Sequence, residues 1–218
     1  MHDISLERDI LKINEDIAER NKKLFRERGV LAINIMGAIG SGKTSLIEIL
    51  SETLQYKIGV IVGDVISDID ANRLKKLGIP VIGVNTGKEC HLDAHLIEHS
   101  LEKLPLNDID ILFIENVGNL ICPVDFSLGA EINITVVSVT EGEDTVEKHP
   151  MIFRISDIAI INKIDLANAV GCNIEKMESD AKKLNPNLKL FRMSIKKKSG
   201  IKPLVRYIDG LLRFNKNQ

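Results

Sequence analysis

The chain lacks tryptophan and has little aromatic content of any kind. Its 218 residues include six phenylalanines and two tyrosines, which makes the aromatic fraction 4%. A surface that binds single-stranded nucleic acid by stacking bases on aromatic rings is therefore not expected. The net charge is −2, so the composition shows no basic footprint for nucleic acid or for an anionic membrane.

Long apolar runs and a large set of cysteines are also missing. No segment approaches the roughly 20 apolar residues of a membrane-spanning helix. Residues 1–29 are highly charged and have no apolar centre like that of a signal peptide. We therefore expect a cytoplasmic protein. Its three cysteines, an odd number in a reducing compartment, argue against a disulfide framework and for thiols that bind metal or act in catalysis.

Short apolar runs alternate with helical patterns along most of the chain. The runs are rich in Ile and Val, and the segments between them repeat apolar residues at helical spacing. This alternation indicates an α/β fold with a mainly parallel sheet and helices on both faces. We expect strands at 31–36, 58–62, 80–84, 110–115, 132–139, 157–161 and 188–193, and helices at 43–54, 69–77, 93–103, 143–154, 173–184 and 201–214.

A polar segment precedes this alternation. Residues from about 5 to 27 predict a helix with Ile10, Ile13, Ile17 and Leu24 near one face. No repeat, low-complexity stretch or linker separates this helix from the rest of the chain. We therefore expect residues 1–218 to form one domain, with the N-terminal helix packed on it.

Residues 37–44 fit the phosphate-binding pattern GxxxxGK[ST], the P-loop. They lie between an expected strand and an expected helix, which is the context that the motif requires. The glycines let backbone N–H groups converge on a phosphate, and the helix N-terminus adds partial positive charge. Lys43 is expected to reach the β- and γ-phosphates, and the Thr44 hydroxyl to bind Mg²⁺. The expected phosphate-binding residues are Gly37, Gly40, Ser41, Gly42, Lys43, Thr44 and Ser45.

A second motif, Asn162-Lys163-Ile164-Asp165, follows an expected strand and indicates the base. The Asp165 carboxylate can accept from both N1–H and the N2 amine of guanine, whereas adenine would leave that charge unpaired. Asn162 would bond the other edge of the base, and the Lys163 stem would lie along the ring. The alternative is that Asp165 only caps a helix start. The sequence favours GTP and GDP, and a backbone N–H of a third loop would bond guanine O6; its residues are Ser194, Ile195 and Lys196.

Acidic residues after two other expected strands are candidates for Mg²⁺ binding and hydrolysis. Glu115 ends the strand at 110–115, where a carboxylate can hold Mg²⁺ or its water shell, and Gly118 can donate its N–H to the γ-phosphate. Asp64 and Asp70 occupy the position of a switch loop, and either can act through Mg²⁺, orient the attacking water or only cap the following helix. The expected catalytic residues are Lys43, Asp64, Asp70 and Glu115, and the expected magnesium residues are Thr44, Asp70 and Glu115.

Cys90 and His91 are adjacent, and both His95 and Cys122 follow further along the chain. These segments come after strand ends, so their side chains can converge at one edge of the nucleotide site. Thiolate and imidazole suit Zn²⁺ or Ni²⁺, although lone cysteines are usually small core residues. With three ligands and His95 as a possible fourth, we expect a labile site or one completed by a second subunit. Two further residues are interpreted as structural, Cys172 and His99.

Taken together, these motifs resemble the hydrogenase nickel-incorporation GTPases, the HypB family, over nearly the whole chain. The matching segments are 37–44, Asp70-Ala71, Cys90-His91, 115–120, Cys122-Pro123 and 162–165. The resemblance implies a SIMIBI-type P-loop GTPase that hydrolyses GTP slowly and forms a homodimer across its nucleotide face. It also implies Ni²⁺ or Zn²⁺ binding by the Cys-His and Cys residues. The expected partners are hydrogenase maturation factors and the [NiFe] hydrogenase large subunit. Lys148 matches a lysine that reaches the partner's nucleotide in that family.

The chain departs from many such relatives, and other functions stay open. It has neither a His-rich N-terminal tract nor an N-terminal Cys-rich nickel motif, so we expect nickel transfer rather than storage. A urease-type nickel GTPase is the nearest alternative, but that family carries a proline between its Cys and His. A nucleoside or nucleotide kinase also uses a P-loop, but Asn162–Asp165 and the lack of an Arg-rich lid argue against it. A non-catalytic protein with structural nucleotide is the third alternative.

Overall fold

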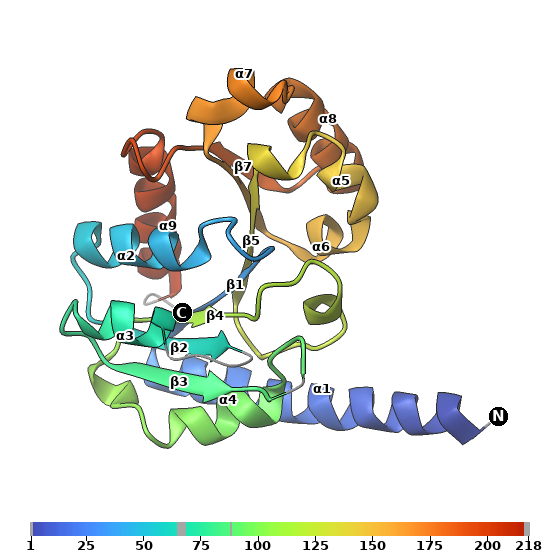
Figure 1. Cartoon of the computed structure of the whole chain (residues 1–218). Coiled ribbons are helices and arrows are strands. Elements are labelled where there is room, and N and C mark those ends of the chain that lie inside the picture. The colour runs from blue at the N-terminus through green and yellow to red at the C-terminus, as the bar shows by residue number, and fades with distance from the viewer. Residues whose placement is uncertain (1, 65–68, 88, 216–218) are drawn as a thin grey trace.

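The structure, a computed structural model, describes residues 2–64, 69–87 and 89–215, a few of them by backbone alone (Figure 1). Seven strands form one parallel sheet in the order β3-β2-β4-β1-β5-β6-β7. This arrangement confirms the predicted α/β class, and each predicted strand is present within two residues at each end. The strands are β1 Leu31–Met36, β2 Ile58–Asp64, β3 Val81–Asn85, β4 Ile111–Glu115, β5 Ile132–Ser138, β6 Ile158–Asn162 and β7 Lys189–Arg192.

Helices cover both faces of the sheet, which explains why the central strands are apolar throughout. Every residue of β1, β4 and β6 is buried. One face packs on α2, α3 and α9, and the other on α1 and α4 at one end and on α5, α6 and α8 at the other (Figure 1). The helices are α1 His2–Arg28, α2 Lys43–Thr53, α3 Ile69–Lys75, α4 Ala94–Leu101, α5 Thr145–Lys148, α6 Pro150–Ile155, α7 Ala167–Val170, α8 Ile174–Leu184 and α9 Ile201–Asn215.

The helix prediction fails in two places. The single helix expected at 143–154 is two short helices, α5 and α6, which meet at His149. Pro150 opens α6 because it has no N–H to donate to a preceding turn, and the first helical position tolerates that loss. The short helix α7 was not predicted; it ends at Gly171, whose φ of 65° suits glycine.

The N-terminal helix α1 packs on the body along only part of its length. Ile17 is buried, but Ile10 and Ile13 are 50% and 60% exposed, so the expectation that they pack on the domain is wrong. Asn14 marks where packing begins: its side chain accepts from Ala94 N at 2.8 Å and donates to Ser127 O at 2.9 Å. Before Asn14 the helix extends beyond the body (Figure 1).

None of the helices within the described ranges combines the length and the hydropathy that a membrane crossing requires.

Candidate functional site

A cavity of about 1000 Å³ lies at the carboxyl ends of the strands, where ligands bind in open parallel sheets. Its lining residues are up to 158 positions apart in the chain, from Ile39 to Lys197. Its lining comprises Ile39, Gly40, Gly42, Lys43, Thr44, Ser45, Gly63, Asp70, Arg73, Glu115, Asn116, Gly118, Asn162, Lys163, Asp165, Leu166, Ile195, Lys196 and Lys197. The residues predicted to bind phosphate, base and magnesium therefore largely share one space.

The P-loop connects β1 to α2 and adopts a conformation that depends on its glycines. Gly42 has a φ of 110°, and a Cβ there would collide with the Asn162 amide. Lys43 folds over the loop and donates from Nζ to Gly37 O at 3.0 Å and to Ala38 O at 3.1 Å. The Ser41 hydroxyl is buried and has no hydrogen-bond partner among the described residues. A buried polar atom without a partner is costly, which fits a loop shaped to hold a phosphate.

Glu115 and Thr44 form the polar floor of the cavity. The Thr44 hydroxyl donates to Glu115 Oε1 at 2.7 Å, and Glu115 is only 4% exposed. Burial raises the pKa of Glu115 to about 7, against the lowering effects of the Thr44 hydrogen bond and the Lys43 charge. In the described part of the chain, Glu115 Oε2 has no hydrogen-bond partner. A hydroxyl and a buried carboxylate with one oxygen to spare are donors that suit Mg²⁺.

The segment that the sequence predicts to recognise the base, residues 162–165 (the base-recognition segment), lies at the end of β6 and is held to the P-loop by Asn162. Asn162 Nδ2 donates to Ser41 O at 2.8 Å, and its Oδ1 accepts from Ile195 N at 3.3 Å. This asparagine was predicted to bind the base; in the structure it joins the three loops that surround the cavity. Lys163 adopts a left-handed conformation, with φ at 59°, and Asp165 is exposed and lines the cavity.

The third loop is a tight turn that follows β7. Ser194 N donates to Ser199 O at 3.1 Å, and Ser199 N returns a bond to Ser194 O at 3.0 Å. Ser194 is buried beneath the turn, whereas Ile195 and Lys196 line the cavity. The Ile195 N–H already donates to Asn162 Oδ1, and the predicted bond from a backbone N–H of this loop to guanine stays a prediction.

The acidic switch segment is described only in part. Asp70 lies in the first turn of α3 and lines the cavity, and its carboxylate is 4.0 Å from Arg73 Nη1. Asp64 ends β2, and the rest of the expected loop, 65–68, lies outside the described residues. Sequence reasoning missed Arg73, which donates to Ser45 Oγ at 2.9 Å and pairs with Glu48. Its only sequence signal is a helical spacing of three from Asp70.

Cys90 and Cys122 meet next to the nucleotide cavity and form a disulfide, with their Cα atoms 6.3 Å apart. The expectation of unpaired thiols is therefore wrong for this structure. Cys90 follows β3 and Cys122 follows β4, and these two strands flank β2 in the sheet, so their loops reach each other above it. The number of cysteines in the sequence does not indicate that these two loops meet. Cys172 is the remaining thiol and is half-buried elsewhere.

Hydrogen bonds connect the loops that carry Cys90 and Cys122 to the residues around the nucleotide cavity. His91 Nδ1 is 3.9 Å from Cys90 Sγ, and the next residue, Leu92, donates its N–H to Asn116 Oδ1 at 3.1 Å. Asn116 directly follows Glu115 and lines the cavity. On the other loop, Asn119 Nδ2 donates to Cys122 Sγ at 3.1 Å, and the Asn119 backbone forms an antiparallel bridge with Gly37 of the P-loop.

The fourth predicted metal ligand lies in a different environment. His95 is exposed on α4, and its Nε2 contacts His99 Nε2 at 3.1 Å. Within the described residues, no three His, Cys, Asp or Glu side chains are grouped to hold one metal ion. His99, which the sequence analysis interprets as structural, is the neighbour of His95 on this helix.

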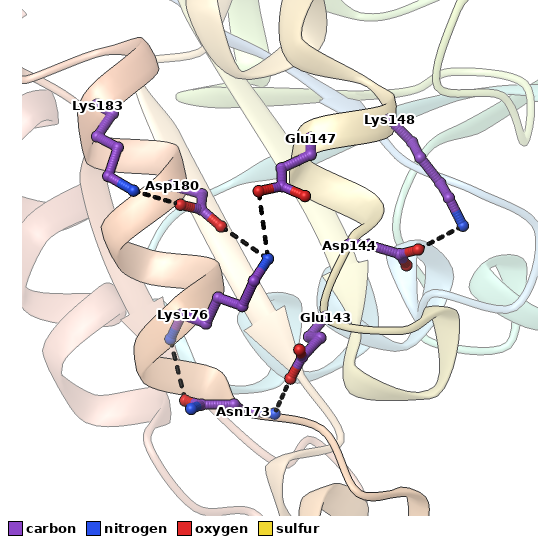
Figure 2. Close-up of polar contacts among 8 residues, drawn as sticks. All are labelled: Glu143, Asp144, Glu147, Lys148, Asn173, Lys176, Asp180 and Lys183. Atoms are coloured by element: carbon purple, nitrogen blue, oxygen red, sulfur yellow. Dashed lines mark hydrogen bonds and ion pairs between the residues drawn. The ribbon is translucent and has the colours of Figure 1, made fainter.

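Lys148, the predicted contact to a partner's nucleotide, is the last residue of α5 and forms an ion pair of its own on the surface (Figure 2). Its Nζ is 2.6 Å from Asp144 Oδ2, away from the residues that line the cavity. Nearby, Lys176 of α8 bridges Glu147 of α5 at 3.4 Å and Asp180 at 3.0 Å (Figure 2). These contacts fix α5 on α8 and leave Lys148 63% exposed in its side chain.

The parallel sheet, the P-loop between β1 and α2, and the loops that surround the cavity define a P-loop nucleotide-binding protein. The family described as "CobW/HypB/UreG, nucleotide-binding domain" matches residues 31–192. The chain belongs to this family and, within it, to the hydrogenase maturation factors named HypB.

Three relatives show how far the similarity extends. A "Probable hydrogenase maturation factor HypB" of Methanocaldococcus jannaschii is 54% identical over 208 residues, which cover 94% of each chain. A "Hydrogenase/urease maturation factor HypB" of Helicobacter pylori is 37% identical and covers 89% of this chain and 82% of its own length. The crystal structure titled HypB from Helicobacter pylori in complex with nickel has a TM-score of 0.89 at 35% identity, covering 93% and 96%.

Proposed function

We propose that this protein is a GTP-hydrolysing metallochaperone that helps insert nickel into [NiFe] hydrogenase. The observation that carries the proposal is the position of two sites side by side. The P-loop, the base-recognition segment and Glu115 share one cavity. Cys90 and Cys122 meet on two loops, one of which is hydrogen-bonded to Asn116 of that cavity and the other to Gly37 of the P-loop. The printed functions of the relatives, hydrogenase maturation and a nickel complex, agree with this assignment.

In the nucleotide site, each residue has a distinct task. Asp165 would accept two hydrogen bonds from guanine, and the P-loop N–H groups would bind the phosphates. Thr44 and Glu115 would hold Mg²⁺, which neutralises charge at the β- and γ-phosphates when it is bound. Lys43 would exchange its carbonyl contacts for phosphate oxygens. Asp70 lies at the cavity wall, where it could orient the attacking water, and turnover is proposed to be slow and regulatory.

The cargo site would use Cys90, His91 and Cys122. A dithiol reductant would open the disulfide and provide two thiolates beside one imidazole, a ligand set that suits Ni²⁺ or Zn²⁺. The hydrogen bonds of Leu92 to Asn116 and of Asn119 to Cys122 would pass a change at Glu115 to both sides of this site. Coupling of this kind must act in both directions.

We further propose a homodimer across the nucleotide face. Three apolar side chains next to the two sites are strongly exposed: Ile39 at 86%, Ile69 at 72% and Ile121 at 65%. Ile39 lies in the P-loop and Ile121 adjoins Cys122, so a second copy on this face would cover them. Lys148 would leave Asp144 to reach the nucleotide of the partner. Light scattering of reduced protein with Ni²⁺ and a non-hydrolysable GTP analogue should show a doubled mass, and a monomer under these conditions would refute the dimer.

Metal titration in two nucleotide states tests the central proposal. Reduced wild type and Cys90→Ala are titrated with Ni²⁺ and with Zn²⁺, each with GDP and with a GTP analogue. Wild type should show a different metal affinity in the two nucleotide states, and the variant should lose both the tight metal site and that difference. Cys172→Ala removes a thiol outside the site and serves as the control. If wild type binds the metal equally tightly in both nucleotide states, the proposed coupling between nucleotide and metal binding is refuted.

Nickel delivery to urease is a second candidate function, since the Helicobacter pylori relative is named for both hydrogenase and urease maturation. Deletion of the gene followed by assay of both nickel enzymes separates the two. A hydrogenase defect without a urease defect supports the first function, and the reverse supports the second.

A further inference from the structure

Both loops that carry the ligands of the proposed cargo site continue onto the surface of α1. The first loop leads from Cys90 and His91 to Ala94, the first residue of α4. The second loop leads from Cys122 to residues 127–129, which bond to α1 ahead of β5. Because the two loops follow different strands, the distance between them depends on what holds both of them.

Two buried asparagines of α1 each form hydrogen bonds with both loops. Asn14 accepts from Ala94 N at 2.8 Å and donates to Ser127 O at 2.9 Å. Asn21 donates from Nδ2 to Ala94 O at 2.9 Å and to Leu128 O at 3.4 Å. The asparagines are seven residues apart and therefore share one face of the helix. An amide has donors and an acceptor, so one side chain can bond to two loops at once. We call this pair the asparagine clamp.

Apolar and backbone contacts also place both loops directly on α1. Gly129 of the second loop has a φ of 82°, and a Cβ there would collide with Ala18 O on the helix backbone. In the first loop, Ala94 packs with Ile17 and Ala18 in a buried apolar cluster. Residues 14–21 of α1 are therefore a common support for the two loops.

The asparagine clamp acts close to a predicted metal ligand. The His91 ring stacks on Phe126 of the second loop, with ring centroids 3.9 Å apart. Phe126 directly precedes Ser127, whose carbonyl accepts from Asn14. A displacement of Ser127 from α1 would therefore move the ring on which His91 lies. Metal–ligand bonds tolerate deviations of only about 0.2 Å, so a site divided between two loops requires a fixed distance between them.

We propose that Asn14 and Asn21 are positioning residues of the cargo site. They hold the loop of Cys90 and His91 and the loop of Cys122 at the distance at which one Ni²⁺ or Zn²⁺ ion can bind to both. The asparagines act on the ligands through the backbone of the two loops, and neither of them lines the nucleotide cavity. This inference rests on the cargo site of the proposed function.

A thiol–disulfide equilibrium measures the distance between the loops without any metal. All proteins carry Cys172→Ser, so that only the two thiols of the cargo site can exchange with glutathione. The ratio of disulfide to reduced protein in glutathione buffers with EDTA gives the effective concentration of one thiol at the other. Asn14→Ala and Asn21→Ala should each lower this concentration about five- to tenfold, the effect of one hydrogen bond on an equilibrium.

Asn185→Ala is the matched control for the loss of a structural asparagine. Asn185 Nδ2 also donates to backbone carbonyls, those of Phe153, Arg154 and Ser156, but these segments carry no ligand of the cargo site. The control should lose stability in urea unfolding and keep the effective thiol concentration of the parent protein. Gly129→Ala removes no side-chain hydrogen bond but forces the second loop away from α1, and it should reproduce the effect of Asn14→Ala. It provides the measurement if an asparagine variant does not fold.

Titration of the same reduced proteins with Ni²⁺ completes the test. Nickel bound by thiolates produces a thiolate-to-nickel charge-transfer band in the near ultraviolet. The two variants of the asparagine clamp and Gly129→Ala should bind nickel about five- to tenfold more weakly than the parent protein, in step with the thiol equilibrium. Asn185→Ala should bind nickel as the parent does. All variants should bind a fluorescent GDP equally, because the clamp lies outside the nucleotide cavity.

The outcomes separate this proposal from the proposed function. If Asn14→Ala, Asn21→Ala and Gly129→Ala keep the thiol equilibrium of the parent, α1 does not set the distance between the loops and the proposal is wrong. It is also wrong if nickel affinity stays unchanged in these variants or falls equally in Asn185→Ala. In each of these cases a nickel band in the parent leaves the proposed function standing. If the parent shows no band, the cargo site is refuted and its positioning residues with it.

Discussion

Burial of Glu115 should make the stability of the nucleotide-free protein depend on pH. The pKa of this carboxyl is raised by burial from 4.5 to about 7. Below about pH 4.5 the group is protonated in both the folded and the unfolded chain and contributes nothing. Between pH 4.5 and 7 the unfolded chain ionises first, which favours unfolding. At 1.36 kcal/mol for each pH unit, the free energy of unfolding at pH 8 should be about 3 kcal/mol lower than below pH 4.5.

Glu115→Gln isolates this contribution because glutamine keeps the shape and the acceptor for Thr44 and removes the charge. Urea unfolding of wild type and variant is measured from pH 5 to 8 in the presence of EDTA. The variant should gain stability over wild type as the pH rises, by about 3 kcal/mol at pH 8. Glu52→Gln on α2 removes an exposed carboxylate, and its pH dependence is subtracted as the control.

Two results would refute the reasoning. The first is a difference between wild type and Glu115→Gln that stays constant from pH 5 to 8, since the buried charge then costs nothing. The second concerns the proton that Glu115 releases when Mg²⁺ and GDP bind. Mg²⁺ and GDP should draw Glu115 into its ionised form, so binding at pH 7 should release about half a proton from this group in wild type, and less in the variant. Equal proton release, from calorimetry in two buffers, would mean that Glu115 does not meet the ion.

Two further predictions concern the P-loop and the thiols. Gly42→Ala should abolish binding of a fluorescent guanine nucleotide, because φ is 110° and a Cβ would collide with a buried amide of the base-recognition segment; Gly210→Ala, in open space on α9, should bind normally and gain up to about 1 kcal/mol in urea unfolding. Protein with the Cys90–Cys122 disulfide intact should show no thiolate-to-nickel band until a reductant is added, and Cys172→Ser should behave in the same way; a band in the oxidised protein contradicts the cargo site.

The sheet could be predicted from the sequence because parallel strands covered on both faces are apolar throughout. The central strands β1, β4 and β6 have this signal, because every one of their residues is buried, whereas the edge strands β3 and β7 are partly exposed. The errors lie where the local signal is weak or absent. Helix α7 has four residues, too few to show a period. The exposure of Ile10 and Ile13 depends on how far the rest of the domain extends along α1. A local sequence pattern does not contain that information.

The candidate site was predictable where its chemistry follows a contiguous motif, as in residues 37–44 and 162–165. It was not predictable where side chains join segments that are distant in the sequence. The Asn116 side chain accepts a hydrogen bond from the backbone N–H of Leu92, 24 residues away. No local pattern in either segment predicts that bond. The disulfide is similar, since its partners meet only because β3 and β4 flank the same strand. Strand order is a property of the whole fold.

Asn162 shows why a correctly located residue can still be given an incomplete role. Its side chain has two N–H donors and an oxygen with two lone pairs. One N–H is used on Ser41 O and one lone pair on Ile195 N, so one donor and one acceptor position remain for a base. The same amide can therefore hold the P-loop against the third loop and still meet guanine. A base that bonds to this amide would contact a residue that is already hydrogen-bonded to Ser41 of the P-loop. Base recognition and phosphate binding would therefore be connected through the Asn162 side chain.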